Sequence, residues 1–223
     1  MYYNLLNQPE KLQRDVSIRL HNKEENRALA MKFDFEYFDG PREQGFGGYV
    51  YDGRWQDVSK RLIEKYKLSS SSKFLDVGCA KGFLMHDLQE ACHGIEVHGL
   101  DISKYAKENS MDSAKEKITI GNCLSLPYPD DFFDCSVAIN TIHNLDVKGC
   151  KKAVKELIRV TKNKSNIFIQ VDAYCNEKEK DMFETWMLTA KTYLMPDEWI
   201  ELFKEVGYEG DYFWTVIGFG DDR

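Results

Sequence analysis

The stretch FLDVGCAKGF, residues 74–83, is the part of the sequence that decides the fold. It begins with an apolar strand, turns at Gly78 and Gly82, and leads into a helix. A glycine turn of this kind lets the backbone approach a ligand closely, and the N-terminus of the next helix favours anionic groups. A dinucleotide-binding turn would need further glycines where this chain has Ala80 and Phe83. The turn therefore predicts a pocket for a nucleoside cofactor other than NAD.

Strand and helix patterns alternate on the C-terminal side of this turn. Strands are expected at residues 74–78, 95–101, 117–121, 133–139, 166–172 and 210–220. Helices are expected at residues 55–67, 82–91, 103–115, 149–162, 177–192 and 196–206. Such alternation predicts an α/β fold with an open, doubly wound, mainly parallel sheet and helices on both faces.

The composition of the 223-residue chain is ordinary for an enzyme, with 43% hydrophobic and 30% charged residues and a net charge of −7. No apolar run approaches the roughly 20 residues of a membrane span, and the N-terminus has no secretory pattern, so we expect a cytoplasmic protein without a membrane partner. Lysines and arginines are spread along the chain, which argues against a nucleic-acid partner. The six cysteines form no C-x-x-C pair and are expected to be reduced packing thiols.

Four landmarks in residues 72–172 resemble the class I S-adenosylmethionine (SAM) dependent methyltransferases. The D-x-G-x-x-x-G pattern of that family's first motif is matched by Asp76, Gly78 and Gly82. Asp101 then ends the next predicted strand, where the family carries an acidic residue. Residues 118–134 resemble the family's G-D-x-x-x-L-P-F run, and residues 138–145 resemble a strand end that often carries histidine. The resemblance implies SAM as cofactor and no required metal.

The resemblance also implies which residues bind SAM. They are Asp76, Gly78, Cys79, Gly82, Asp101, Ile102, Asn122, Cys123 and Asn140. In this pattern Asp101 takes the ribose hydroxyls, Ile102 packs on adenine, and Asn122 lies beside the adenine amino group. Many family members have Asp in place of Asn122, so a charge-assisted hydrogen bond is lost here. The alternative for the two acidic residues is a solvated carboxylate at a strand end.

The N-terminal region is expected to form an extension of the core domain. Residues 9–32 have the apolar spacing of one helix, and residues 37–55 are aromatic and glycine-rich without a helical period. The prediction divides the chain into residues 1–55, a helix with an aromatic lid segment, and residues 56–223, a SAM-binding domain. Elements at residues 177–206 are expected to contribute to the acceptor site.

The lid interpretation gives aromatic and basic residues a role next to SAM. Tyr49, Tyr51 or Trp55 would face the sulfonium through a cation–π contact, and Arg54 would clamp a carboxylate or phosphate of SAM or of the acceptor. The alternative is an aromatic anchor that packs the N-terminal helix onto the domain. Both interpretations stay open at the level of sequence.

The acceptor side offers fewer distinctive residues. The catalytic candidates are His143, Asn140 and Tyr51. His143 is a candidate proton acceptor because an unperturbed histidine titrates near neutrality, and the alternative is a structural histidine at the strand end. Further candidates by location at the carboxyl edge of the sheet are Thr141, Asn144, Asp172 and Tyr174.

These features together predict a SAM-dependent methyltransferase that resembles bacterial small-molecule methyltransferases. The expected reaction is methyl transfer to an oxygen or nitrogen of a small polar metabolite. The alternatives are methylation of a macromolecule, RNA or protein, and a SAM-binding scaffold or regulatory protein without catalysis. An acidic chain without a basic appended domain disfavours RNA.

Overall fold

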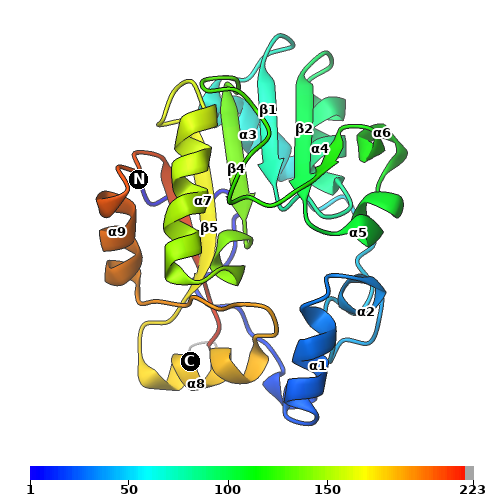
Figure 1. Cartoon of the computed structure of the whole chain (residues 1–223), viewed down its shortest axis with the longest axis vertical. Coiled ribbons are helices and arrows are strands. Elements are labelled where there is room, and N and C mark those ends of the chain that lie inside the picture. Colours follow the sequence, from blue (N-terminus) through cyan, green and yellow to red (C-terminus); the bar gives the residue numbers. More distant parts are fainter. Residues whose placement is uncertain (219–223) are drawn as a thin grey trace.

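The computed structural model describes residues 1–218, and the six strands in this range form one sheet (Figure 1). The strands are β1 (Lys73–Val77), β2 (Glu96–Asp101), β3 (Ile118–Ile120), β4 (Cys135–Ile139), β5 (Ile167–Ala173) and β6 (Asp211–Val216). Their order is β3-β2-β1-β4-β5-β6, and every neighbouring pair is parallel. The predicted open parallel sheet is confirmed. The predicted last strand is β6, and residues 219 and 220 of that prediction lie outside the described residues.

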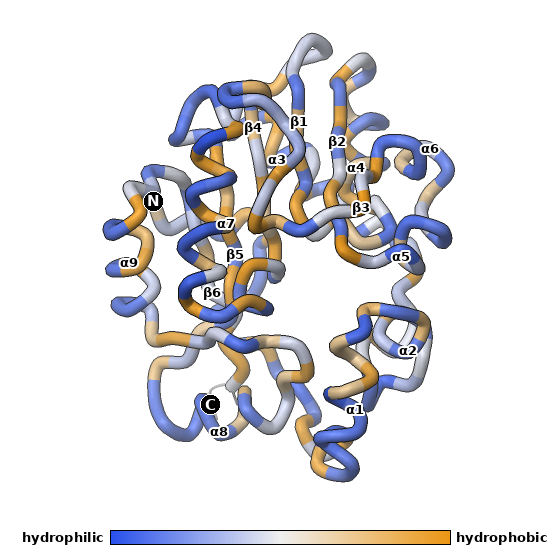
Figure 2. The backbone as a smooth tube through the Cα atoms, in the orientation of Figure 1, coloured by the Kyte–Doolittle hydropathy of each residue, from blue (hydrophilic) through white to orange (hydrophobic). Residues whose placement is uncertain are grey.

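Two helix layers cover the faces of the sheet. Helices α3 (Gln56–Tyr66) and α4 (Phe83–Ala91) pack on one face, and α7 (Val147–Val160) and α9 (Pro196–Glu205) pack on the other. Side chains alternate along a strand, so Ile167 and Ile169 of β5 face α7 whereas Phe168 faces the opposite layer. Figure 2 shows hydrophilic and hydrophobic residues alternating along α7, as expected for a helix with one face on a sheet. The doubly wound arrangement is therefore confirmed.

The remaining helices are short, and several lie beyond the carboxyl ends of the strands. They are η1 (Val16–Arg19), α1 (Lys23–Ala30), α2 (Phe35–Phe38), α5 (Lys104–Glu108), α6 (Asp112–Lys115), η2 (Ile142–Asn144) and α8 (Glu177–Trp186). In Figure 1, α1, α2 and α8 lie on the side to which the strand arrows point. The carboxyl edge of the sheet is thus faced by elements from both ends of the chain.

Two predicted helices are shorter in the structure because their backbone is bonded elsewhere. The helix expected at 103–115 is divided into α5 and α6, since the N–H of Met111 donates to the carbonyl of Lys81. The helix expected at 177–192 ends at Trp186, and the N–H groups of Lys191 and Thr192 donate to the carbonyl of His143. Both differences bring loop backbone to the carboxyl edge of the sheet.

The prediction of one helix over residues 9–32 is wrong. Leu12 forms a parallel bridge with Ile217, and its N–H donates to the carbonyl of Val216 at 2.8 Å. Tyr2 pairs in the same way with Tyr212. The N-terminal segment is extended here because β6 is an edge strand whose backbone groups need partners. The domain division at residue 55 stays a prediction.

Within residues 1–218, no helix is both long and apolar enough to cross a membrane.

Candidate functional site

The glycine turn after β1 is held tightly against β2. The N–H of Gly78 donates to the carbonyl of Leu100 at 2.7 Å, and the N–H of Ala80 donates to Asp101 Oδ2 at 2.7 Å. Gly78 has φ +81°, and a Cβ there would lie 2.0 Å from Thr141 Oγ1, so a larger residue is excluded. These turn amides are bonded within the protein. The N–H groups of Gly78 and Ala80 are thus used to shape the turn and to position the carboxylate of Asp101.

Asp76 is a buried carboxylate next to this turn. Its side chain is only 5% exposed, and within residues 1–218 it has no hydrogen-bond or ion-pair partner. Burial and the neighbouring charge of Asp101 raise the pKa of Asp76 to about 7. A buried carboxylate without a partner is costly to a fold. Its presence indicates a site that receives a ligand with a positive charge or hydrogen-bond donors.

Asp101 ends β2 and is oriented by backbone N–H groups. Its Oδ2 accepts from Ala80, and its Oδ1 accepts from Ser103 at 2.8 Å. Burial raises the pKa of Asp101, and these backbone hydrogen bonds oppose the rise. Each carboxylate oxygen has a second lone pair for a ligand hydroxyl. The next residue, Ile102, is 56% exposed, so an apolar surface is available beside this carboxylate.

Other residues predicted to bind SAM differ in what they present. The side chain of Cys79 is buried in the core, and only the backbone of this residue belongs to the turn. Asn122 is exposed, and its Oδ1 accepts from the N–H of Leu124 at 2.9 Å. Burial raises the pKa of Cys123 to about 11 and that of Cys79 well above its usual value. Neither cysteine is therefore a thiolate nucleophile.

The N-terminal segment is fixed to the glycine turn by Lys81, the residue before the N-cap Gly82. Lys81 is buried, and its Nζ lies 2.6 and 2.8 Å from the two carboxylate oxygens of Asp39. The hydroxyl of Tyr105 donates to Asp39 at 2.6 Å. Burial tends to raise the pKa of Asp39, but the hydrogen bonds from Lys81 and Tyr105 hold it below its usual value. We call this set of three side chains the Asp39 clamp.

The aromatic residues of the segment pack around the same turn. Tyr49 stacks on Phe83 with ring centroids 4.9 Å apart and an interplanar angle of 17°. Burial and the charge of Asp76 raise the pKa of Tyr49, which places this ring near the orphaned carboxylate. Both interpretations of the segment, an anchor and a cover over the turn, are compatible with this packing.

Tyr51 and Arg54 are directed elsewhere. The hydroxyl of Tyr51 donates to Asp87 of α4 at 2.5 Å. Arg54 is exposed and forms an ion pair with Asp52 of its own loop at 2.6 Å. Tyr51 therefore has its hydroxyl occupied on α4, and Arg54 would have to exchange its partner to bind a ligand.

At the end of β4 and β5, His143 and Asp172 form a closely coupled pair. His143 Nδ1 accepts from the backbone N–H of Asp172 at 3.1 Å, and its Nε2 lies 3.3 Å from Asp172 Oδ2. The side chain of His143 is buried, so both ring nitrogens face Asp172 and neither is free for a substrate. Burial raises the pKa of Asp172, and the charges of His143 and Arg14 lower it. The carboxylate is consequently the better placed proton acceptor of the pair.

Asn140 lies beside this pair in a conformation unusual for a residue other than glycine. Its φ is +52°, and its Oδ1 accepts from the hydroxyl of Thr215 at 3.1 Å. Thr215 in turn accepts from Gln170 Nε2 at 2.9 Å. Asn140 is exposed, and this hydrogen bond ties its side chain toward the edge strand β6.

Residues from the N-terminal segment that the sequence did not single out also reach this edge. The charges of Asp101 and Asp172 both act on Tyr37, whose pKa burial raises to about 12. The ring of Trp186 at the end of α8 has the guanidinium carbons of three arginines near its centroid. These residues lie in stretches without a motif, so only the folded chain brings them together.

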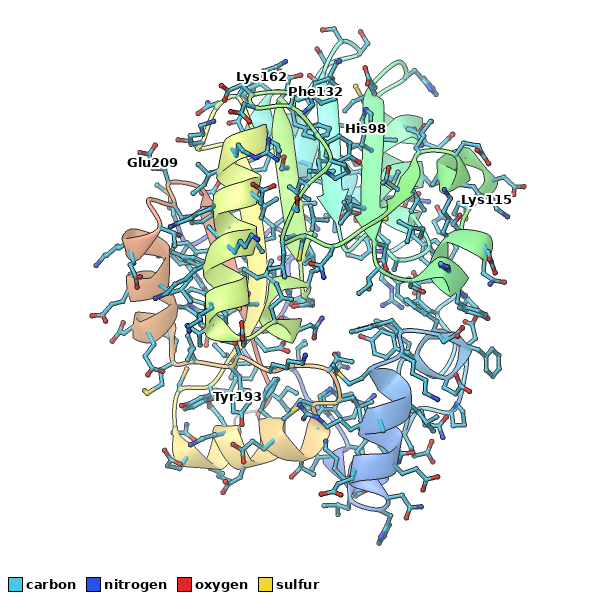
Figure 3. The ribbon with its side chains drawn as sticks, viewed as in Figure 1. His98, Lys115, Phe132, Lys162, Tyr193 and Glu209 are labelled. Atoms are coloured by element: carbon cyan, nitrogen blue, oxygen red, sulfur yellow. The ribbon has the colours of Figure 1, made fainter. Side chains whose placement is uncertain are left out.

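At the opposite end of the sheet, several charged side chains among residues 1–218 pair with one another. Figure 3 places His98 and Phe132 at that end, and Tyr193 beside α8 on the carboxyl side. His98 Nε2 lies 2.7 Å from Glu96, and its ring contacts Phe132. Among residues 1–218, no group of three or more His, Cys, Asp or Glu side chains is arranged to hold a metal ion.

Comparisons with known proteins agree with this geometry. Residues 75–169 match the family described as "Methyltransferase domain". A tRNA (carboxymethyluridine(34)-5-O)-methyltransferase of Arabidopsis thaliana is 30% identical over 148 residues, which are 66% of this chain and 34% of that protein. The O-methyltransferase resE of Aspergillus sclerotiorum is 25% identical over 199 residues, with 79% and 72% coverage. The chain spans about a third of the plant relative.

A solved structure supports the fold. A chain of the complex that contains the Haloferax volcanii Trm112 methyltransferase activator superimposes with a TM-score of 0.56 at 19% identity, covering 67% of this chain and 66% of that one. The six-stranded parallel sheet with helices around it matches the class I methyltransferase fold. Residues 75–169 match the methyltransferase domain, and the predicted resemblance to the class I methyltransferases is confirmed. SAM is the cofactor that this class implies.

Proposed function

We propose that this protein transfers a methyl group from SAM to an oxygen or nitrogen atom of a small polar acceptor. The observation that carries the proposal is the orphaned carboxylate of Asp76 beside the oriented carboxylate of Asp101. Bound SAM would supply an electrophilic methyl group on a sulfonium. The chain's own contribution is to hold SAM and the acceptor in line and to accept a proton from the acceptor.

The residues around the turn fit the groups of SAM. Asp76 offers a carboxylate to the ammonium of the methionine part, and Asp101 offers its free lone pairs to the ribose hydroxyls. The exposed side chain of Ile102 offers an apolar surface to adenine. Asn122 keeps its amide N–H groups and one carbonyl lone pair for the adenine edge, because Leu124 uses the other.

Proton acceptance is assigned to Asp172, with His143 as its positioning residue. The backbone of Asp172 is held on both sides, since its N–H donates to His143 and its carbonyl accepts from Trp199 Nε1 at 2.9 Å. A carboxylate with a raised pKa is a better base than an exposed one. This assignment differs from the sequence prediction, in which His143 itself takes the proton.

Calorimetry with S-adenosylhomocysteine (SAH) and SAM tests the cofactor site directly. We expect binding to the wild type and strong weakening in Asp101→Asn. Glu201→Gln removes an exposed carboxylate on α9 and serves as the matched control. Equal affinity of the wild type and Asp101→Asn, or no binding of either ligand to the wild type, would overturn the proposal.

A macromolecular acceptor is the second candidate function. It is favoured by the similarity to the plant relative, a tRNA methyltransferase. Against it stands the acidic chain, in which 37 Asp and Glu residues outnumber 30 Lys and Arg residues. Methyl transfer to total tRNA, compared with transfer to small-metabolite fractions, separates the two.

A further inference from the structure

Five cations of the N-terminal segment gather around the end of α8 in an otherwise acidic protein. They are Arg14, Arg19, Lys23, Arg27 and Arg42, and within residues 1–218 none of them forms an ion pair with a carboxylate. We call them the N-terminal cation cluster. The ion pairs of the described chain lie elsewhere, so this region keeps its positive charge.

Three members of the cluster have a structural task. Arg19 donates to the carbonyl of Trp186 at 2.7 Å, Lys23 donates to the carbonyl of Met187, and Arg27 donates to the carbonyl of Ala190 at 3.0 Å. These carbonyls lie at and beyond the C-terminus of α8, where cations are favourable. Their donors satisfy the backbone but leave the cationic charge uncompensated.

Arg14 has no such task. Within residues 1–218, its guanidinium has no hydrogen-bond partner, and its one specific contact is with the ring of Trp186, 5.6 Å from guanidinium carbon to centroid. The same ring is contacted by Arg19 at 3.8 Å and by Arg42 at 4.9 Å. Arg14 is also exposed, so its planar set of N–H donors is available to a ligand.

The position of Arg14 connects the cluster to the acceptor side of the sheet. Leu12, two residues earlier, is bonded to Val216 at the carboxyl end of β6. Partial burial lowers the pKa of Arg14, the charge of Arg54 lowers it further, and the carboxylate of Asp172 raises it. The charges of a second arginine and of the proposed proton acceptor therefore both act on Arg14.

We propose that Arg14 binds an anionic group, a carboxylate or a phosphate, of the methyl acceptor, and that the acceptor is consequently an acidic small molecule. The part of this inference that concerns the methyl acceptor rests on the proposed function. The anion site at Arg14 does not depend on it. Guanidinium groups bind such anions with paired hydrogen bonds, and the neighbouring cations add to the local positive potential. The negative charge of Asp172 would repel the anionic group of the acceptor. This repulsion would orient the acceptor with its anionic group toward Arg14 and away from Asp172.

Binding of two simple anions tests the site without knowledge of the acceptor. Acetate and inorganic phosphate are titrated into the SAH complex at constant ionic strength, and the arginine Nε–Hε resonances are followed by NMR. We expect saturable shifts of the Arg14 resonance with a midpoint on the order of 1–10 mM. The stronger of the two anions identifies the class of acidic group. The shifts should vanish in Arg14→Gln and persist in Lys204→Gln, a variant of equal charge on the exposed side of α9.

An activity measurement provides the second arm. Small metabolites are separated by anion exchange into retained and unretained pools, and methyl transfer is measured for each. We expect turnover in the retained pool and a rise of about 10- to 100-fold in KM for Arg14→Gln, with unchanged SAH affinity. Non-saturating anion shifts, turnover in the unretained pool or in tRNA alone, or a weakening of SAH binding in Arg14→Gln would each overturn the anion site.

The two proposals fail in distinguishable ways. Loss of the anion site with intact SAH binding and turnover leaves the methyltransferase proposal in place. Absence of SAM and SAH binding in the wild type overturns the methyltransferase proposal, and the NMR titration of the free protein then still decides whether Arg14 binds anions.

Discussion

We call the proposed SAM site around Asp76 and Asp101 the cofactor edge, and the proposed acceptor site around Asp172 and Arg14 the acceptor edge. The two are built in different ways. The cofactor edge is one contiguous stretch, in which β1, the glycine turn and β2 place Asp76 and Asp101 together through backbone hydrogen bonds. The acceptor edge combines the N-terminal segment, the ends of β4 and β5, and α8, and it depends on side chains such as Arg14. The two carboxylates of the first site lie within one β-α-β stretch, whereas the residues of the second come from both ends of the chain. Variation of the flanking segments is therefore expected to change the acceptor without changing the cofactor.

The largest expected effect distinguishes the proposed proton acceptor, Asp172, from its positioning residue, His143. Asp172→Asn should lower kcat by about 10²- to 10⁴-fold, because it removes the proton acceptor. His143→Asn should retain more activity and move the acidic limb of the pH–rate profile upward, since Asp172 loses its contact with His143 Nε2, a neighbour that lowers its pKa. Steady-state kinetics with the acceptor of the active pool measure both. A larger loss in His143→Asn, with Asp172→Asn nearly intact, would make His143 the base.

The next largest effect concerns the pH dependence of stability, which should report on the buried carboxylate of Asp76. The pKa of Asp76 rises from its usual 3.8 to about 7 on folding, so the folded ligand-free protein holds a proton that the unfolded chain has lost. The free energy of unfolding should therefore fall as pH rises from about 4 to 7, by up to about 4 kcal/mol. Urea unfolding of the wild type and Asp76→Asn measures this. Equal slopes in the two proteins would contradict an orphaned carboxylate.

Asp101→Ala should weaken SAH binding by about 100-fold, which corresponds to roughly 2.7 kcal/mol, because charge-assisted hydrogen bonds to hydroxyls are lost. The affinity for small anions should stay unchanged, since Arg14 lies at the other edge. Calorimetry and the anion titration on one preparation check the pair of results. Parallel losses of both affinities would show that the edges are not independent.

Gly78→Ala should destabilise the fold by about 2–4 kcal/mol, because φ is positive and the added Cβ meets Thr141 Oγ1. Gly207→Ala is the matched control: its φ is +73°, but no atom lies within 4 Å of an added Cβ. The control should cost about 1 kcal/mol. Thermal melts give both values, and similar losses would mean that close approach at the turn is unimportant.

The smallest expected effect concerns the Asp39 clamp, which joins the N-terminal segment to the turn. Lys81→Met should weaken SAH binding by about 3- to 10-fold and speed proteolysis within residues 37–55, since Asp39 loses its ion pair. A double-mutant cycle with Asp39→Asn should give a coupling of about 1–3 kcal/mol. A coupling near zero would mean that the clamp does not hold the segment.

The placement of Asp76, Gly78 and Asp101 at one end of the sheet is predictable from the sequence, and that of the residues around Asp172 is less so, for a physical reason. Asp76, Gly78 and Asp101 are placed by strand ends and a turn whose local backbone geometry leaves a pattern in the sequence. The apolar spacing of residues 9–32 also fits a helix, but β6 offered an edge, and Leu12 pairs there. A helical period is insufficient where a distant strand competes for the same backbone.

The side chains of the acceptor edge illustrate the other limit. His143 was singled out because a histidine follows a strand, yet only the structure shows that Asp172 occupies both of its ring nitrogens. Arg14 lies within the residues predicted to form a helix, and no motif distinguishes it from its neighbours. Its proximity to Trp186 depends on contacts between residues more than 170 positions apart.

The pairing of the N-terminal segment with β6 also sets an order of assembly. Leu12 bonds to Val216, so a loop of about 200 residues must close before the segment that carries Arg14 is in place. During synthesis, β1, the glycine turn and β2 are complete long before β6 emerges. A nascent chain can therefore place Asp76 and Asp101 before Arg14 is in position, and the proposed anion site is complete only when the last strand joins the sheet.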